Sequence, residues 1–466
     1  MALKKVVSLL LTLMITSLVS AGCGKGSNTE PSTTAQPTTN SEQTTTNTNT
    51  SATDSTLKVS DKDMTITLWD IATEDPTKKI QEGAVNRFMK DHPNVKVEMN
   101  HIVNDTYKQK LVVAMSSGKC PNMYIHWGGG PMIEYINSGF AVPITDLMKN
   151  HCKVDFLKAA IAQSTYKDEI YAVPFTRISG SGVFYNKNIF AKYNLQAPKT
   201  ISELENVCET LKSNGIIPFA LANQSKWTGS MYYMYLVARK SGLEEFNKAV
   251  DGSGSFESEA FQYAGDTIQK WVKAGYFPEG VNSLSADDGM DRQLMYQEKA
   301  AMMLQGTWQA PQMYNDNKDW YTQNIDYFGF PTLEGSSADQ SIVVGTAIDN
   351  AFSFNTGDDK DLLNACFILA TQYYNDDTYI KEQLETGSIP SINGAGDNVS
   401  DHCMQKVWAD FSKASDVQLW YDQYLPPEVA EVHKTTSQEI FGLTKTPAQA
   451  NKELQSAMTK YLSKKQ

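Results

Sequence analysis

Hydrophobic and polar positions follow two different periods after residue 60. Residues 64–69 alternate as in a half-buried strand, and residues 95–102 alternate in the same way. Between them, apolar residues recur every three or four positions from 80 to 89, which is the period of a helix. A second amphipathic segment at 107–117 leads to a third strand at 122–127. This order is typical of an α/β sheet in which most strands are parallel.

Further strands and helices are predicted as far as the C-terminus. Asp75 followed by Pro76 predicts the start of the first helix, with Asp75 as its N-cap. Further strands are expected at 171–174, 183–186, 216–221, 300–305, 326–331 and 342–354. Further helices are expected at 201–213, 260–274, 362–374 and 448–462. These elements predict two α/β lobes with several chain crossings, and ligands of such sheets bind beyond the carboxyl ends of the strands.

The N-terminus has the pattern of an export signal. Lys4 and Lys5 precede an uncharged apolar run at 6–19, which is too short to span a bilayer. Small residues then lead to Cys23, so we expect a signal peptide at 1–22 and a lipid on Cys23, as in a lipoprotein. Residues 19–21 also fit an ordinary cleavage site, which would give plain secretion.

The segment after Cys23 has the composition of a tether. Residues 24–56 contain no Val, Ile, Leu, Met, Phe, Trp, Tyr or Cys, and twelve Thr lie between 24 and 60. Such a segment buries too little apolar area to offset its ordering entropy. We therefore expect residues 23–60 to be a disordered tether. It would hold the protein at the outer face of a cell membrane, as in Gram-positive bacteria.

Residues 61–466 are too many for one ordinary domain, so two are expected. The expected N-terminal lobe comprises 61–174 and 340–376, and the C-terminal lobe comprises 175–339 and 377–466. Hydrophobic residues make up 41% of the chain, enough for two cores. The net charge of −12 disfavours nucleic acid and anionic lipid as partners. We also expect the protein to be a monomer.

The cysteines do not indicate a disulfide framework or a metal site. Five remain besides Cys23, an odd and unclustered set: Cys120, Cys152, Cys208, Cys366 and Cys403. We expect mostly buried thiols, although one bridge is compatible with an extracellular location. His151-Cys152 and His402-Cys403 lack metal-ligand spacing, so no metal and no cofactor is expected.

Several short motifs, taken in their order along the chain, resemble those of a known family. They lie at 68–70, 118–127, 139–143, 171–174, 185–187, 252–277, 299–308 and 330–335. Residues 61–466 thereby resemble the extracellular solute-binding proteins of family 1, which serve ABC sugar importers and are distantly similar to maltose-binding protein. The resemblance implies a two-lobed, periplasmic-binding-protein-like fold of type II, with hinge crossovers between the lobes. It also implies an oligosaccharide ligand and the transmembrane subunits of an ABC permease as partners.

A sugar site needs planar polar groups for hydroxyls and aromatic rings for the C–H faces. Such residue types cluster at predicted strand ends and at the expected crossover between lobes. The candidate ligand-binding residues are Asp70, Glu74, His126, Trp127, Arg177, Ser179, Asn223, Trp227, Trp308 and Asp349. Positions 223 and 227 follow from the resemblance, and Trp308 matches the family's Gly-x-Trp stacking position.

Structural roles remain open for several of these residues. Asp70 suits a turn cap, and Arg177 suits a pair with an acidic neighbour. His126 and Trp127 precede three glycines, where a backbone can approach a ligand closely. Trp420, with Tyr421 and Tyr424, fits either an additional platform or packing between helices.

Enzymatic functions find little support in the sequence. It contains no His-Glu-x-x-His, Gly-x-Ser-x-Gly or P-loop motif. A segment starting at Asp251 resembles a calcium loop but has Phe256 where Gly is required, and Gln262 at the position of the essential Glu. The remaining alternatives are a non-sugar solute, a sugar-sensing co-receptor, and a glycosidase that needs only two carboxylates.

Overall fold

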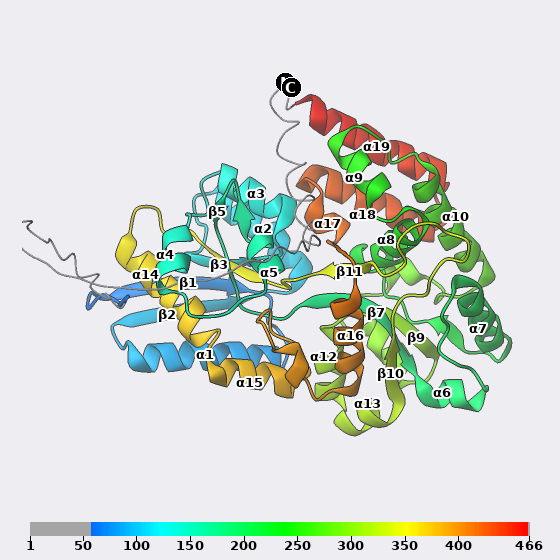
Figure 1. Ribbon diagram of the computed structural model, residues 1–466, viewed down its shortest axis with the longest axis horizontal. Coiled ribbons are helices and arrows are strands. Elements are labelled where there is room, and N and C mark those ends of the chain that lie inside the picture. The colour runs from blue at the N-terminus through cyan, green and yellow to red at the C-terminus, as the bar shows by residue number, and fades with distance from the viewer. Residues whose placement is uncertain (1–56, 465–466) are drawn as a thin grey trace, which may run out of the picture. The chain divides into compact units, whose positions relative to one another are not determined.

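The computed structural model describes residues 57–464, which form two α/β lobes (Figure 1). The predicted signal peptide, Cys23 and nearly all of the predicted tether lie outside the described residues. The predicted two-lobed α/β architecture is confirmed, with a separate sheet in each lobe. Among residues 57–464, no helix combines the length and the apolar character needed to cross a bilayer.

The first lobe is built on a five-stranded sheet in the order β2-β1-β3-β12-β6. Its strands are β1 (Met64–Asp70), β2 (Val95–His101), β3 (Met123–His126), β6 (Val173–Pro174) and β12 (Ala351–Phe354), with a separate hairpin of β4 (Thr165–Tyr166) and β5 (Glu169–Ile170). Its helices are α1 (Thr77–Asp91), α2 (Asn104–Ser116), α3 (Gly129–Asn137), α4 (Thr145–His151), α5 (Lys158–Gln163), α14 (Lys360–Ile368) and α15 (Asp377–Glu385). Alternate apolar residues of β1 and the buried face of α1 meet in one core.

The second lobe has a six-stranded sheet in the order β13-β11-β7-β9-β8, with β10 also paired to β7. Its strands are β7 (Ser179–Asn186), β8 (Ile217–Phe219), β9 (Ala300–Gly306), β10 (Ile325–Phe328), β11 (Val343–Thr346) and β13 (Val417–Gln418). The helices before residue 300 are α6 (Lys187–Lys192), α7 (Ile201–Ser213), α8 (Trp227–Ser241), α9 (Glu244–Asp251), α10 (Glu259–Ala274) and α11 (Met290–Tyr296). The later ones are α12 (Gln309–Asp316), α13 (Lys318–Asn324), α16 (His402–Lys413), α17 (Tyr421–Tyr424), α18 (Pro427–Phe441) and α19 (Pro447–Ser463).

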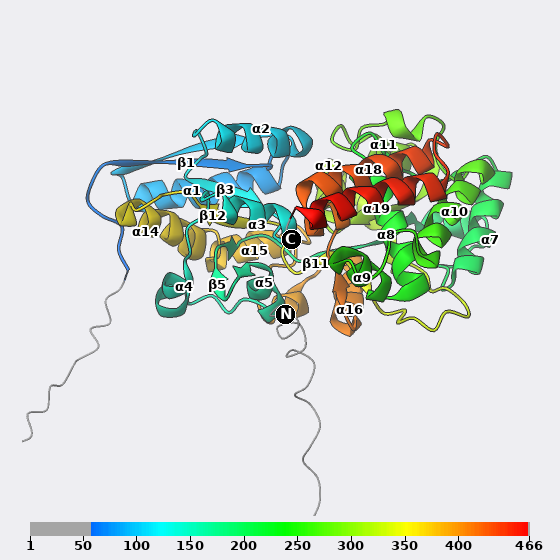
Figure 2. The same cartoon turned by 90° about the horizontal axis from the view of Figure 1, so that it is seen from above.

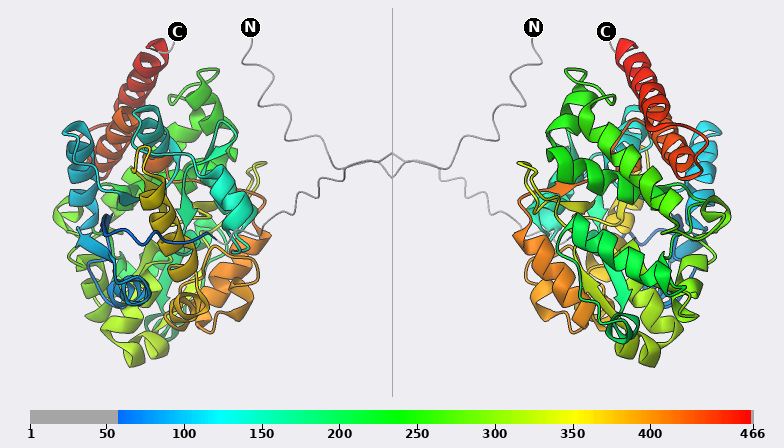
Figure 3. Two further views of the ribbon diagram at one scale, coloured as in Figure 1. Left: turned by 90° about the vertical axis from the view of Figure 1, so that its left-hand side faces the viewer. Right: turned by 90° about the vertical axis from the view of Figure 1, so that its right-hand side faces the viewer.

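The two lobes are joined by chain segments that cross near each other. Figure 2 shows the sheets and helices of each lobe from above, and Figure 3 shows the molecule from its two ends. The backbone N–H of Asp349 donates to Arg177 at 2.8 Å, and that of Ile178 donates to Ile389 at 2.8 Å. Three crossings, near residues 177, 348 and 389, therefore lie side by side.

Both sheets are mixed, so the expectation of mostly parallel sheets needs correction. β1 runs parallel to β2 and β3, but β12 is antiparallel to β3 and β6. In the second sheet, β7 is antiparallel to β9, β10 and β11. β12 enters the first sheet after the chain returns from the other lobe, so no strand–helix–strand connection fixes its direction.

The predicted strand at 342–354 is two strands in different sheets. β11 pairs with β7 through Gly345 and Gly180, whereas β12 pairs with β3. The expected boundary placed residues 340–346 in the first lobe. Because β11 pairs with β7, they do not belong to that lobe. The boundary after residue 376 also shifts, because Tyr379 of α15 lies in the core of the first lobe.

Two helices differ from the prediction for local reasons. α1 begins at Thr77 with Pro76 at the N-cap position and no side-chain cap. Asp75 instead pairs with Lys79 at 2.5 Å. α8 was not predicted, because twelve consecutive residues from Thr228 to Arg239 are buried and leave no polar face to mark a helical period.

Candidate functional site

A cavity lies between the two lobes and takes its walls from both. Its volume is about 190 Å³, more than ten times the roughly 10–15 Å³ that one water requires, so it is more than a packing defect. The first lobe contributes the loop after β1, the first two turns of α1 and α2, and Trp127. The second lobe contributes residues at or near the starts of α8, α11, α12 and α17.

Three tryptophans of the second lobe form one aromatic wall. The rings of Trp227 and Trp308 lie 5.6 Å apart at 71°, and those of Trp308 and Trp420 lie 5.8 Å apart at 62°. Gly306 permits this arrangement, because a Cβ there would lie 2.2 Å from a ring carbon of Trp308. Trp127 comes from the first lobe and is held edge-on by Tyr107 at 6.1 Å. The cavity therefore offers apolar faces from both lobes.

Most charged groups of the cavity wall are held in ion pairs. Arg177 contacts Asp349 at 2.9 Å, and it counteracts the effect of burial, which raises the pKa of Asp349. Glu74 accepts from Arg292 at 3.3 Å and from Gln312 at 3.2 Å. These ion pairs already neutralise one another, so they do not require a charged ligand.

Two ion pairs of the cavity wall join the lobes directly. Glu74 of the first lobe meets Arg292 of the second, and Lys108 of α2 lies 3.6 Å from Asp422 of α17. Lys108 also lies 4.7 Å above the ring of Trp127. The charged pairs thus stand at the junction where the lobes meet around the cavity.

The glycines after Trp127 bring the lobes close at a further point. A Cβ on Gly129 would lie 2.0 Å from the carbonyl oxygen of Gln423, and one on Gly130 would lie 2.4 Å from that of Leu425. The sequence suggested a close approach of backbone to ligand at these glycines. In the structure the close neighbour is the backbone at α17 of the other lobe.

Six of the ten residues proposed from the sequence line the cavity. They are Glu74, Trp127, Arg177, Trp227, Trp308 and Asp349. The other four, Asp70, His126, Ser179 and Asn223, do not line it and are fully buried.

Asp70 and His126 hold backbone turns next to the cavity. Asp70 accepts from the N–H of Ala72 at 2.9 Å and contacts His101 Nδ1 at 2.6 Å, which raises the pKa of His101. His126 Nδ1 accepts from the N–H of Gly128 at 3.0 Å, and its Nε2 lies 2.8 Å from Ser353 Oγ. Burial lowers the pKa of His126 to about 3, so its ring is neutral near pH 7.

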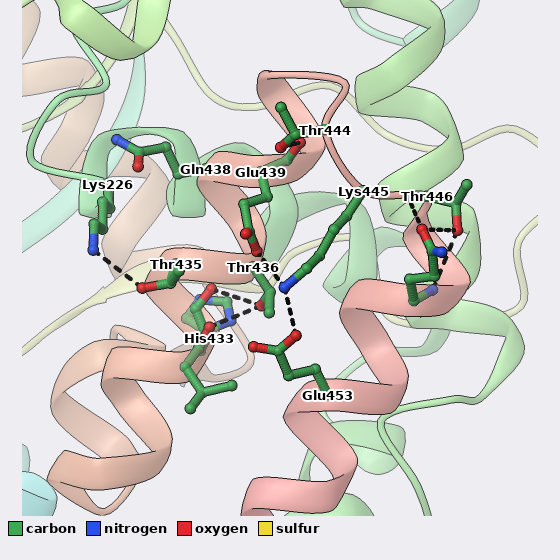
Figure 4. Close-up of polar contacts among 12 residues, drawn as sticks. Lys226, His433, Thr435, Thr436, Gln438, Glu439, Thr444, Lys445, Thr446 and Glu453 are labelled. Carbon is green, nitrogen blue, oxygen red and sulfur yellow. Dashed lines mark hydrogen bonds and ion pairs between the residues drawn. The ribbon is translucent and has the colours of Figure 1, made fainter.

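Asn223 positions the loop that carries Trp227. Its Oδ1 accepts from the N–H of Gly229 at 2.9 Å, and its carbonyl accepts from Gln438 of α18 at 2.7 Å. Lys226 in the same loop donates to Thr435 at 3.1 Å (Figure 4). Ser179 lies within β7, fully buried. Asn223 therefore shapes the site from outside the cavity.

Sequence reasoning missed several polar residues of the cavity wall. They include Gln81, Asn104, Lys108, Asp287, Arg292, Gln309, Gln312, Asn350, Asp422 and Gln423. Many lie in or beside the first turns of helices rather than at strand exits, and no motif marks them. Trp420, for which packing and platform were both open, lines the cavity while remaining buried.

Asp287 gives the site a testable pH dependence. Burial and the negative charge of Asp105 raise the pKa of Asp287 to about 6, while Lys108 opposes this shift. The ordinary value is about 3.9, so the contribution of Asp287 to stability is full below pH 4 and is lost as the pH rises through 6. We expect Asp287→Asn to gain in Tm relative to the parent protein between pH 4 and 7. Thermal unfolding across this range measures it, and an offset independent of pH would contradict it.

One cluster of potential metal ligands lies away from the cavity. In residues 57–464, the ligand atoms of Asp326, His402 and Cys403 approach within 4.8 Å of one another. Lys406 contacts Asp326, and His402 Nε2 lies 2.8 Å from the carbonyl oxygen of Ile325. Asp326 and His402 thus each have a protein partner outside the cluster.

The fold and the site together define a class of protein. Two α/β lobes joined by adjacent crossings around an aromatic cavity are the architecture of type II periplasmic binding proteins. The profile of the bacterial extracellular solute-binding proteins matches residues 72–362, and the chain belongs to this family. The predicted resemblance is confirmed. The family consists of substrate-binding receptors that serve ABC transporters.

Individual relatives agree with this assignment. An uncharacterized ABC transporter extracellular-binding protein of Pyrococcus horikoshii is 27% identical over 72% of this chain and 70% of its own. A probable sugar-binding periplasmic protein of Mesorhizobium japonicum is 24% identical over 71% of this chain and 78% of its own. A solved structure from work on xylan utilization by Caldanaerobius polysaccharolyticus has a TM-score of 0.76 and 27% identity, covering 84% of this chain and 99% of the other.

Proposed function

We propose that this protein captures a neutral oligosaccharide between its lobes outside the cell and delivers it to the transmembrane subunits of an ABC permease. The observation that carries the proposal is the aromatic wall of Trp227, Trp308 and Trp420, together with Trp127, which lines the same cavity from the first lobe. Aromatic faces suit the C–H faces of sugar rings. The relatives whose descriptions mention sugar or xylan support the same class of ligand.

The mechanism proposed is closure of the lobes about the three adjacent crossings. A ligand that contacts both lobes favours the closed arrangement by its differential affinity for it. The permease would then recognise the closed monomer. Glu74 and Asp349 are poorly suited to proton transfer, because each is paired with a cation.

We further propose that a lipid on Cys23 anchors the protein to the outer face of the membrane, with residues 24–60 as the tether. Cys23→Ala is expected to move the protein from the membrane fraction to the medium, because a lipidated Cys23 would be its attachment to the bilayer. Fractionation of cells that express the two forms measures this. An equal distribution of both forms would contradict the anchor and leave plain secretion.

Calorimetric titration with neutral oligosaccharides, followed by analysis of the mixtures for cleavage, tests the proposed function. Saturable binding without products supports it. Absence of binding across xylose-, glucose- and N-acetylglucosamine-based oligomers would favour a non-sugar solute, and products would make the protein a glycosidase. Copurification with a signalling receptor instead of a permease would make it a sensor subunit.

A further inference from the structure

Two buried glutamines face the cavity from opposite lobes. Gln81 lies in the second turn of α1, and Gln309 is the first residue of α12, directly after Trp308. Each is only 3% exposed, and both line the cavity. Neither was singled out by its sequence context.

Most other buried amides of the described residues make side-chain hydrogen bonds, and these two do not. The Oε1 atoms of Gln81 and Gln309 are buried without a hydrogen bond, and within residues 57–464 neither side chain makes one. Leaving a buried amide unpaired is costly, so native proteins rarely do so without a functional reason. Two further polar atoms of the wall, Arg177 Nε and Trp227 Nε1, are also unpaired.

The charged residues of the same cavity are less free than these amides to form new hydrogen bonds with a ligand. Arg177 is held by Asp349, and Arg292 by Glu74 and Asp316. A ligand contacting the paired atoms of these groups would compete with existing ion pairs. The amides offer hydrogen bonds without such competition.

We propose that Gln81 and Gln309 are specificity-determining residues that bind hydroxyl groups of the ligand, one from each lobe. The inference rests on the proposed function and deepens it. A primary amide carries an acceptor and two donors side by side, and rotation about its last bond exchanges them. It therefore matches two adjacent hydroxyls of a sugar ring, each of which both donates and accepts. Because the two amides belong to different lobes, a ligand bound to both also links the lobes.

Leucine replacements test the proposal, since they keep the size of the side chain and remove its polar atoms. Gln81→Leu and Gln309→Leu are each expected to raise the Kd 10- to 100-fold, equivalent to about 1.4–2.7 kcal/mol. The probes are the neutral tetrasaccharides of xylose, glucose and N-acetylglucosamine, titrated by calorimetry. Gln383→Leu is the matched control, because Gln383 is 1% exposed in α15 and does not line the cavity.

Thermal unfolding without sugar separates a binding role from a structural one. Removing an unpaired buried amide is expected to leave the Tm of the two variants unchanged or higher, whereas loss of a structural hydrogen bond would lower it. Weaker binding at an undiminished Tm supports the proposal. Binding equal to that of the parent protein would overturn it. If the parent protein binds none of the probes, the proposed function itself fails, and this inference fails with it.

Discussion

Trp308→Ala is expected to weaken oligosaccharide binding by at least about 2 kcal/mol, roughly a 30-fold rise in Kd. Trp308 is the central ring of the aromatic wall, in contact with Trp227 on one side and Trp420 on the other. Gly306 leaves room for this ring, because a Cβ at that position would lie 2.2 Å from a ring carbon of Trp308. Its loss would remove a stacking surface from a desolvated cavity and loosen the two neighbouring rings.

Calorimetry on the variant measures this effect, with Trp320→Ala as the control. Trp320 lies in α13, packs against Tyr296 at 4.9 Å and does not line the cavity. We expect Trp320→Ala to keep the parental affinity. Equal affinity of Trp308→Ala and the parent protein would show that the sugar binds elsewhere.

Gly130→Ala is expected to hinder closure of the lobes and weaken binding by about 1–3 kcal/mol, the usual cost of overpacking. The added Cβ would lie 2.4 Å from the carbonyl oxygen and 2.9 Å from the carbonyl carbon of Leu425. Both partners are backbone, so α3 and α17 must separate for the side chain to fit. Gly130 has no positive φ, unlike Gly129, and the substitution therefore adds no local backbone strain.

Solution X-ray scattering with saturating sugar measures the separation of the lobes. The variant is expected to keep a larger radius of gyration than the parent protein. Gly83→Ala provides the matched control, since its Cβ would meet only Arg87 at 3.6 Å within α1. Parental affinity and a parental radius for Gly130→Ala would mean that this contact is not part of the closed state.

Much of the fold follows from short-range patterns. Strict alternation at residues 64–69 and 95–102 predicted β1 and β2, and the amphipathic run at 201–213 predicted α7 with its bounds. These patterns fail where a segment is buried on all sides. α8 carries no polar face, and the apolar run that contains β11 and β12 gives no sign that the chain crosses from one sheet to the other within it.

The aromatic part of the site was easier to predict than the polar part. Tryptophan is rare, and Trp127, Trp227 and Trp308 lie at strand or helix ends where a ligand can reach them. Polar residues are common and have many structural uses, as the turn held by Asp70 and the loop held by Asn223 illustrate. Gln81 gave no local signal, because its significance lies in a missing hydrogen bond that only the folded chain reveals.

A crystal structure of the protein grown with the oligosaccharide that binds most tightly in calorimetry would show where the sugar binds and whether it stays intact. We expect an intact sugar between the lobes, with a ring stacked on Trp308 and hydroxyls bound by Gln81 and Gln309. A sugar bound outside the interlobe cavity, or electron density for cleaved products within it, would show that the protein is not a receptor that holds sugar in this cavity.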